Sequence, residues 1–342
     1  MKSMAGAFDT QQQFFHELKE QLPAHISLVD DIAEALGISY DSAYRRIRGE
    51  KELSFSELQK IVARYNLSPA QVLQQQAQGH EISFQYNPLN SQTFNMYDYL
   101  VSAGKEIKGL SGIADSEMIY AAKDIPIFHY FLIDEVGWFK MFVWQKTLIG
   151  FPEFDNQRFS LKRPDERIME AGKKLLYEYI NFSSTELWNE ETIYSYLKQV
   201  EFYCEADLFE DKQDAFIILD KLEEYLDHLK KMAAHGQKFL PGKEPTGNSE
   251  NFKLYHNEVV RSDNTIMARV GERKVTFLTH SAMNFLRTTD VRFCETTHQW
   301  LTHLIKRSGL ISTVSEKHRN QFFAKLHEQV KNSRERVTYL LK

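Results

Sequence analysis

The chain has 342 residues, 42% hydrophobic and 26% charged, which is an ordinary composition for a globular protein of two or three domains. The formal net charge of −5 excludes a generally basic protein that coats nucleic acid, so any DNA contact must come from a local cluster of positive charge. The two cysteines, Cys204 and Cys294, are too few for a disulfide framework or a cysteine-based zinc site. We expect neither a metal nor a cofactor.

The most apolar stretch of the chain, residues 125–150, is interrupted by Asp134, Glu135 and Lys140. That pattern suits buried helices better than a membrane span. The first thirty residues contain no continuous apolar segment of the kind found in secretory signals. We therefore expect a cytoplasmic protein with no membrane partner.

Residues 8–77 carry the start and stop signals of five short helices, each with its own capping chemistry. The expected N-caps are Asp9, Ser27, Ser39, Ser54 and Ser68, and the residues that end the first three helices are Pro23, Gly37 and Gly49. Glu57 completes an S-x-x-E capping box with Ser54, and Pro69 stands at the first helical position after Ser68. The sequence therefore predicts a compact five-helix bundle.

Part of this bundle, residues 27–72, resembles the helix-turn-helix of lambda-repressor and Cro-like regulators, the XRE family. The matching residues are Ile32-Ala33, Gly37 at the turn, Ser39, Ala43, Gly49, Leu58 and Ile61-Val62. The matching run covers less than a quarter of the chain. The resemblance implies a domain that binds double-stranded DNA and belongs to a transcription regulator.

The third helix would be the recognition helix of such a domain. On a helix, Ala43 and Ile47 share one side and would face the bundle, which leaves polar side chains on the other. The predicted DNA-binding residues are Tyr40, Asp41, Ser42, Tyr44, Arg45, Arg46, Arg48 and Lys51. Arginine can pair with guanine through two hydrogen bonds. Arg46 and Lys51 are expected to contact phosphates.

Two other interpretations of this helix stay open. The arginines could form a solvated face without a ligand, or the bundle could dock a protein partner in a signalling adaptor. Residues 1–78 hold 8 lysines and arginines against 10 aspartates and glutamates. One copy should then bind DNA weakly, because neutralising phosphates supplies much of the affinity.

Turn-forming residues predict a linker at 79–96, which separates the DNA-binding domain, residues 1–78, from a regulatory or dimerisation domain, residues 97–342. The larger domain is expected to be mostly helical. The predicted helices lie near residues 97–109, 127–148, 165–181, 190–206, 212–234, 290–307 and 315–331. Three short strands, residues 252–260, 265–270 and 273–280, are expected to form an antiparallel segment with turns at Ser262-Asp263-Asn264 and Gly271-Glu272.

Two apolar patterns in the larger domain are ambiguous. The aromatic run between Phe128 and Trp144 is either core or the lining of a ligand pocket. The 3-4 spacing of Leu219, Leu222, Leu226 and Leu229 suits either a seam between subunits or packing inside one domain. No nucleophile–base pair or phosphate-binding loop occurs at an informative spacing, so we do not expect an enzyme.

Together these patterns predict a mainly α protein: a five-helix helix-turn-helix bundle followed by a larger, mostly helical α+β domain with a small three-stranded antiparallel segment. The predicted function is sequence-specific transcription regulation by a homodimer, with a C-terminal sensor or dimerisation domain. A small-molecule or peptide effector is left open.

Overall fold

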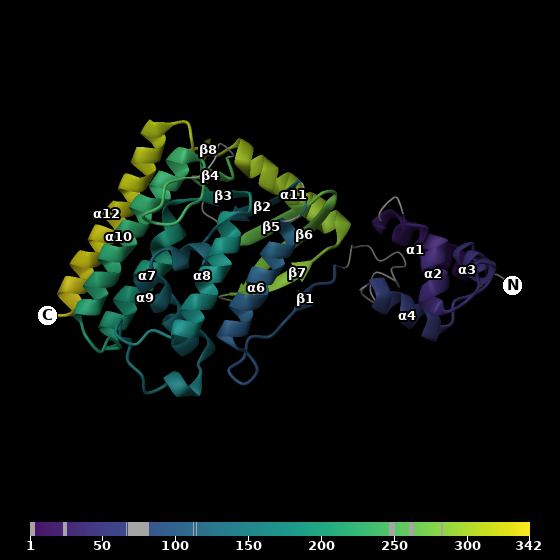
Figure 1. Ribbon diagram of the computed structural model, residues 1–342, viewed down its shortest axis with the longest axis horizontal. Helices are drawn as coiled ribbons and strands as arrows, with labels where there is room; N and C mark the ends of the chain where they lie inside the picture. The colour runs from purple at the N-terminus through teal and green to yellow at the C-terminus, as the bar shows by residue number, and fades with distance from the viewer. Residues whose placement is uncertain are drawn as a thin grey trace. The chain divides into compact units, whose positions relative to one another are not determined.

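The computed structural model describes residues 4–22, 26–65, 67, 82–111, 113, 115–245, 250–259, 263–281 and 283–342. The chain divides into unit 1, Met1–Ser83, and unit 2, Phe84–Lys342, each with its own hydrophobic core (Figure 1). Within the described residues, no helix combines the length and the apolar character that a bilayer crossing requires.

Four helices form the described part of unit 1: α1 (Met4–Gln21), α2 (Leu28–Leu36), α3 (Tyr40–Ile47) and α4 (Phe55–Tyr65). α1 begins before Asp9, so the prediction that Asp9 is its N-cap is wrong. The predicted stop at Pro23 and the predicted fifth helix at Ser68 and Pro69 lie outside the described residues. Apolar residues at helical spacing form the core: Phe15, Leu18, Leu28, Ile32, Leu36, Ala43 and Ile61.

Unit 2 contains a mixed eight-stranded sheet in the order β1-β7-β6-β5-β2-β3-β4-β8. The strands are β1 (Gln85–Tyr86), β2 (Ser116–Ala121), β3 (Ser184–Trp188), β4 (Phe252–His256), β5 (Thr265–Val270), β6 (Arg273–Ser281), β7 (Asn284–Thr288) and β8 (Gly309–Leu310). β2, β3 and β4 are parallel neighbours, and the remaining pairs are antiparallel. Parallel neighbours need long crossovers, which the helices between them supply.

The prediction of a small three-stranded antiparallel segment is wrong. β5 and β6 do form a hairpin whose turn contains Gly271, with a φ of 57°, and Glu272. β4, however, pairs in parallel with β3 and antiparallel with β8, so it does not form a hairpin with β5. Residue 260, the end of the first predicted strand, and residue 262, the start of the predicted turn, lie outside the described residues.

The region predicted as a linker lies partly in unit 2. That unit begins at Phe84, and β1 pairs with β7 through Gln85 opposite Arg287 and Tyr86 opposite Leu286. The two strands are about two hundred residues apart in the chain, so the pairing leaves no local signal in the sequence. The turn-forming residues near β1 predicted a connection there, and the strand was missed.

Most helices of unit 2 lie close to their predicted positions, but the last one continues to Leu340, beyond its predicted end at residue 331. They are α6 (Met96–Ser111), α7 (Asp134–Val143), α8 (Glu166–Ile180), α9 (Tyr194–Glu205), α10 (Gln213–His235), α11 (Val291–Lys306) and α12 (Glu316–Leu340). The helix predicted at 127–148 is instead three pieces: the 3₁₀-helix η1 (Ile127–Leu132), α7, and the π-helix η2 (Trp144–Ile149). The extended Ile133 separates η1 from α7, whereas α7 continues directly into η2. Two further 3₁₀ turns are η3 (Pro152–Phe154) and η4 (Glu190–Ile193).

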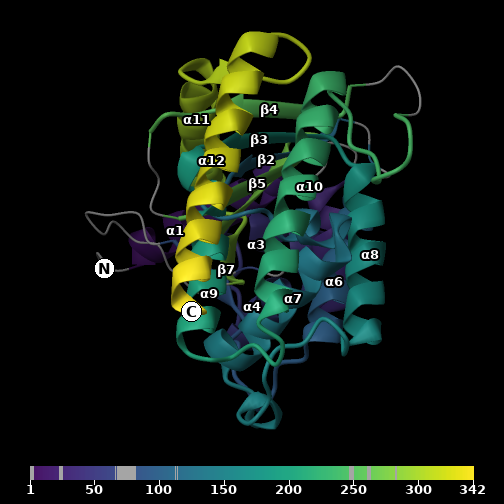
Figure 2. The same ribbon diagram turned by 90° about the vertical axis from the view of Figure 1, so that its left-hand side faces the viewer.

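The leucines of α10 belong to the core of unit 2. Leu219, Leu222, Leu226 and Leu229 are each 0% exposed. The interpretation of this row as a seam between subunits is therefore wrong, and packing inside one domain is correct. α10 lies beside α12 (Figure 2).

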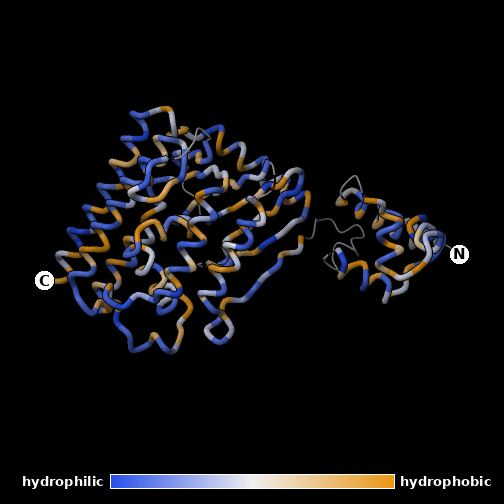
Figure 3. The backbone as a smooth tube through the Cα atoms, in the orientation of Figure 1, coloured by the Kyte–Doolittle hydropathy of each residue, from blue (hydrophilic) through white to orange (hydrophobic). Residues whose placement is uncertain are grey.

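Helices cover both faces of the sheet. On one face, Ile119 of β2, Leu187 of β3 and Met267 of β5 pack against Leu301 of α11. The side chains that alternate with them point toward the larger helical layer, in which α10 and α12 stand in front of the central strands (Figure 2). Hydrophilic residues predominate along α12, the helix at the C-terminal end (Figure 3).

A buried polar cluster lies on the helical side of β3. Glu186 is 0% exposed and accepts hydrogen bonds from Tyr179 Oη and, at 2.7 Å, from Trp188 Nε1, while its Oε1 lies 2.8 Å from His129 Nε2. Burial opposes ionisation of Glu186, but the contacts with His129 and Tyr179 outweigh it and lower the pKa of this carboxyl. Lys238 Nζ lies 4.2 Å from the centre of the Tyr179 ring, and burial lowers the pKa of this lysine to about 7.

Candidate nucleic-acid interface

A turn of three residues, 37–39, joins α2 to α3. Gly37 has a φ of 66°, a left-handed conformation that glycine adopts without steric cost, and its N–H donates to the carbonyl of Glu34 at 3.2 Å. Ser39 Oγ then accepts a hydrogen bond from the N–H of Ser42 at 3.3 Å and caps α3. The predicted turn glycine and N-cap are therefore present, in the arrangement typical of a helix-turn-helix.

The two faces of α3 differ as the sequence predicts. Ala43 is 0% exposed and, with the half-buried Ile47, packs into the core of unit 1. On the other side, Tyr40 and Tyr44 are 57% and 41% exposed. Their rings stack with the centres 6.5 Å apart. The guanidinium of Arg48 lies 5.5 Å from the centre of the Tyr44 ring. Residues 40, 44 and 48 thus form one exposed strip, which we call the α3 strip.

Arg45 lies beside the α3 strip, which itself contains Arg48. The side chains of Arg45 and Arg48 are 53% and 58% exposed, and their nearest carboxylate is Glu50, at 3.9 and 3.4 Å. Exposed pairs of this kind contribute little energy, so both guanidinium groups can exchange Glu50 for another anion at small cost. Asp41 and Lys51 are also exposed.

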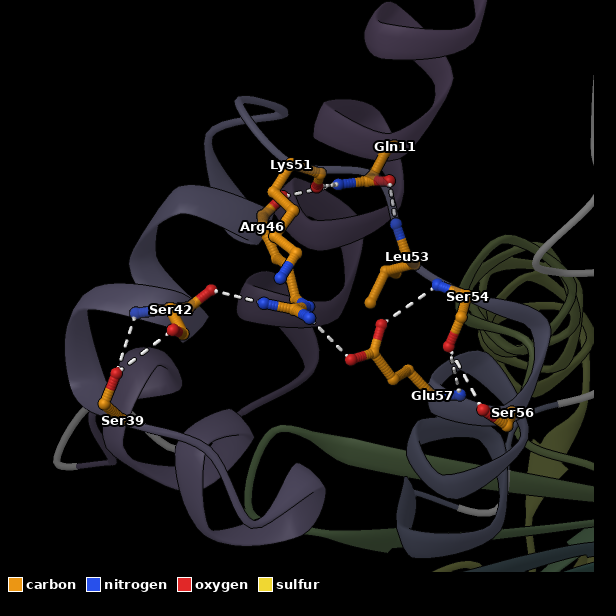
Figure 4. A network of polar contacts seen from close by, with 9 residues as sticks. All are labelled: Gln11, Ser39, Ser42, Arg46, Lys51, Leu53, Ser54, Ser56 and Glu57. Atoms are coloured by element: carbon orange, nitrogen blue, oxygen red, sulfur yellow. Dashed lines mark hydrogen bonds and ion pairs between the residues drawn. The ribbon is translucent and has the colours of Figure 1, made fainter.

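Two of the predicted contact residues are less available. Ser42 is half-buried, and its Oγ lies 3.1 Å from Ser39 Oγ. Arg46 is only 5% exposed; its Nη1 donates to the carbonyl of Ser42 at 3.0 Å and its Nη2 to Glu57 Oε1 at 2.6 Å (Figure 4). The prediction that Arg46 contacts phosphates is therefore wrong, because its guanidinium is bound inside unit 1.

Glu57 has a second partner besides Arg46. Its Oε2 accepts a hydrogen bond from the N–H of Ser54 at 2.9 Å, while Ser54 Oγ accepts one from the N–H of Glu57 at 3.3 Å. These are the reciprocal bonds of the predicted capping box. The hydrogen bond from Arg46, opposed by burial, holds the pKa of Glu57 below its ordinary value of 4.5.

Two glutamines of α1 brace the end of α3. Gln11 Nε2 donates to the carbonyls of Arg46 and Lys51 at 2.7 and 2.8 Å, and its Oε1 accepts from the N–H of Leu53 at 2.9 Å (Figure 4). Gln12 Nε2 donates to the carbonyl of Arg48 at 2.6 Å. Sequence reasoning missed both glutamines, because nothing local indicates that the polar face of α1 meets the loop after α3.

A third set of contacts ties α2 to α4. Arg64 Nη2 contacts Asp31 and, at 2.7 Å, Glu34 Oε2, and Tyr65 Oη donates to Asp31. The hydrogen bond from Arg64, opposed by burial, lowers the pKa of Asp31. α2 and α4, which pack beside α3, are therefore joined by hydrogen bonds and ion pairs as well as by apolar core contacts.

Residues 19–117 match the model of the BetR domain. The match includes α2, α3 and α4 and continues into unit 2 as far as the start of β2. No curated protein and no solved structure matches the chain. Among the described residues, no group of three or more histidine, cysteine, aspartate or glutamate side chains is placed to hold a metal ion.

Proposed function

We propose that the protein is a transcription regulator of the lambda-repressor and Cro-like type, which binds double-stranded DNA in a sequence-specific manner through α3. The α3 strip and the neighbouring Arg45 carry the proposal, because they form an exposed face with two tyrosines and two arginines on a helix that follows a short glycine turn. A helix presented in this way can enter the major groove, where arginine recognises guanine.

Within this proposal the contacts have different roles. Arg45 and Arg48 contact base edges, and Tyr40, Asp41 and Tyr44 lie beside them on the exposed face. Lys51, exposed in the loop after α3, contacts a phosphate. Arg46 contributes indirectly, since it fixes the end of α3 through Glu57. The BetR match supports a regulatory role for the same segment.

The acidic balance of residues 1–78 supports a second element of the proposal. A single unit 1 has few cations for phosphates, and two copies on half-sites about one DNA turn apart would combine their contacts. We propose that unit 2 holds a cytoplasmic homodimer together and does not act as an enzyme.

One observation favours the alternative, an adaptor that docks a protein partner. Phe55, at the start of α4, is 76% exposed, and the unit is net acidic. Such a surface is compatible with a protein partner.

Selection of genomic DNA fragments by the purified full chain at low salt separates the two functions. The regulator should enrich one sequence motif, and Arg45→Ala should lose that enrichment while its melting temperature stays unchanged. If no motif is enriched, the DNA-binding proposal is wrong and the adaptor remains.

A further inference from the structure

A cavity of about 520 Å³ lies in unit 2 between the first turns of α6 and α8, the end of α7, and the connection from η2 to α8. Its volume falls in the range of about 300–1,000 Å³ that is typical of small-molecule sites. α6 and α8 lie side by side (Figure 1). Met96 and Arg167, from their first turns, both line the cavity.

The floor of this cavity is apolar. Trp138, Phe142, Phe151 and Ile168 line it and are between 2% and 6% exposed. Trp138 Nε1 donates to the carbonyl of Ser160 at 3.0 Å, so the one polar group of the indole is already satisfied. These four side chains are almost fully covered, so the apolar surface that a ligand can reach comes from the half-buried rings of Phe94 and Phe154, which also line the cavity.

The rim of the cavity is rich in arginine. Arg158 and Arg163 each contact a carboxylate outside the cavity lining, Asp207 and Glu210 respectively. Arg167 differs: within the described part of the chain it has no carboxylate partner and no hydrogen bond, and its guanidinium lies 5.0 Å from the centre of the Tyr97 ring. Stacking orients a guanidinium and leaves its N–H donors free for an anion.

The acidic groups at the cavity are Glu153 and Asp165. Asp165 Oδ1 accepts a hydrogen bond from the N–H of Ile168 at 3.1 Å, so it serves as the N-cap of α8. Glu153 is exposed at the rim. Arg167 therefore remains the charged group of the rim that is both oriented and unpaired.

The wall of the cavity includes an unusual backbone segment. Gln145, 5% exposed, lines the cavity from the π-helix η2, whose carbonyl at this residue accepts hydrogen bonds from the N–H groups of Gly150 and Phe151. π-helical turns are rare and occur frequently at functional sites.

We propose that this cavity binds a small organic anion with a flat apolar body, which lies against Phe94 and Phe154 while its anionic group pairs with Arg167. The two rings select the body and Arg167 selects the charge. None of the lining residues belongs to the predicted DNA contacts of unit 1.

Two fluorescent probes of the same shape test the proposal on the full chain. 8-Anilinonaphthalene-1-sulfonate is an aromatic anion, and N-phenyl-1-naphthylamine is its uncharged counterpart. The anion should bind with a stoichiometry of one and at least about tenfold more tightly than the neutral probe. Arg167→Gln should weaken anion binding about tenfold, leave the neutral probe unaffected, and retain the wild-type melting temperature.

The control is Lys174→Gln, which removes an exposed cation of α8 that does not line the cavity. It should bind both probes as the wild type does. Arg167→Lys keeps the charge without the planar fork and should give intermediate anion affinity. Equal affinity of the wild type for the two probes, unchanged anion affinity in Arg167→Gln, or an equal loss in Lys174→Gln would each overturn the proposal.

Discussion

Arg46 and Glu57 form an ion pair with 2.6 Å between Nη2 and Oε1, and this pair joins the last turn of α3 to the first turn of α4. Their side chains are 6% and 18% exposed, so water screens the pair only weakly. Together with Gln11 and Gln12 of α1, the pair holds the end of α3 in place within unit 1. Arg46, which was predicted from the sequence to contact DNA, thus stabilises the end of α3 instead.

Arg46→Ala should destabilise α3 and α4. Removing one partner of a buried pair leaves the other charge uncompensated, at a cost of about 3 kcal/mol. Hydrogen–deuterium exchange followed by mass spectrometry should show faster exchange in both helices. Arg45→Ala is the matched control, because its exposed side chain should change the stability by less than about 0.5 kcal/mol. Equal protection in the two variants would contradict the assignment.

Unit 1 should lose stability in acid. The pKa of Glu57 is lowered in the folded chain from 4.5, so its stabilising contribution is complete above the unfolded pKa and is lost as the pH falls through the folded pKa. Exchange protection of α4 should therefore fall below about pH 4.5. Glu57→Gln should remove this part of the pH dependence. If the protection of α4 fell with pH in this variant as it does in the wild type, other carboxyl groups would cause the loss of stability.

Arg45→Ala and Lys51→Ala should weaken DNA binding in different ways. Loss of a base contact at Arg45 should cost about 1–3 kcal/mol on the selected site and relax the preference there. Loss of a phosphate contact at Lys51 should weaken all sequences alike and reduce the slope of log affinity against log salt by about 1. Fluorescence anisotropy at several salt concentrations measures both effects. Lys60→Ala, an exposed change on α4 outside the predicted contacts, should have neither.

Unit 2 should become more stable as the pH rises from about 7 to about 9, where Lys238 and Lys140 act in the same direction and the buried thiol of Cys204, whose pKa burial raises, does not yet oppose them. Burial lowers the pKa of Lys238 from 10.5 to about 7, so in this window the folded chain binds fewer protons here than the unfolded chain does. Since stability rises with pH wherever the unfolded state binds more protons, the urea midpoint should increase. All four tryptophans, which report unfolding by fluorescence, lie in this unit. Lys238→Met should flatten the profile, and an unchanged slope would refute the assignment.

Light scattering should show that the full chain is a dimer at micromolar concentration and that residues 1–78 alone are monomeric. The α10 leucines should play no direct part in this association. Leu222→Ala should instead lower the free energy of unfolding by about 2–5 kcal/mol, because Leu222 is 0% exposed in the core. A monomeric full chain would rule out the dimer. If the Leu222→Ala dimer dissociated into monomers without a loss of stability, the leucines of α10 would have to be interpreted as a seam between subunits after all.

Local signals predicted the helices of unit 1 well, because the cap at Ser39, the turn at Gly37 and the box of Ser54 and Glu57 act within a few residues. Pairings between distant segments were missed. β2 and β3 are short and largely buried on both faces, so they show no polar alternation, and the partner of β1 lies near the other end of the chain. The burial of Arg46 could not be predicted from the sequence either, since it depends on the position of Glu57 in a different helix.

The sheet of unit 2 ends on both sides in a strand of only two residues, β1 at one edge and β8 at the other. Long, flat edge strands are templates for the addition of a further strand, and very short ones are a common protection against it. Among the described residues, the outermost strands therefore offer a second copy of the chain only two residues at each edge. Association of two copies through unit 2 would then depend mainly on side chains of helices and loops. Single substitutions in such an interface can strengthen or weaken the association.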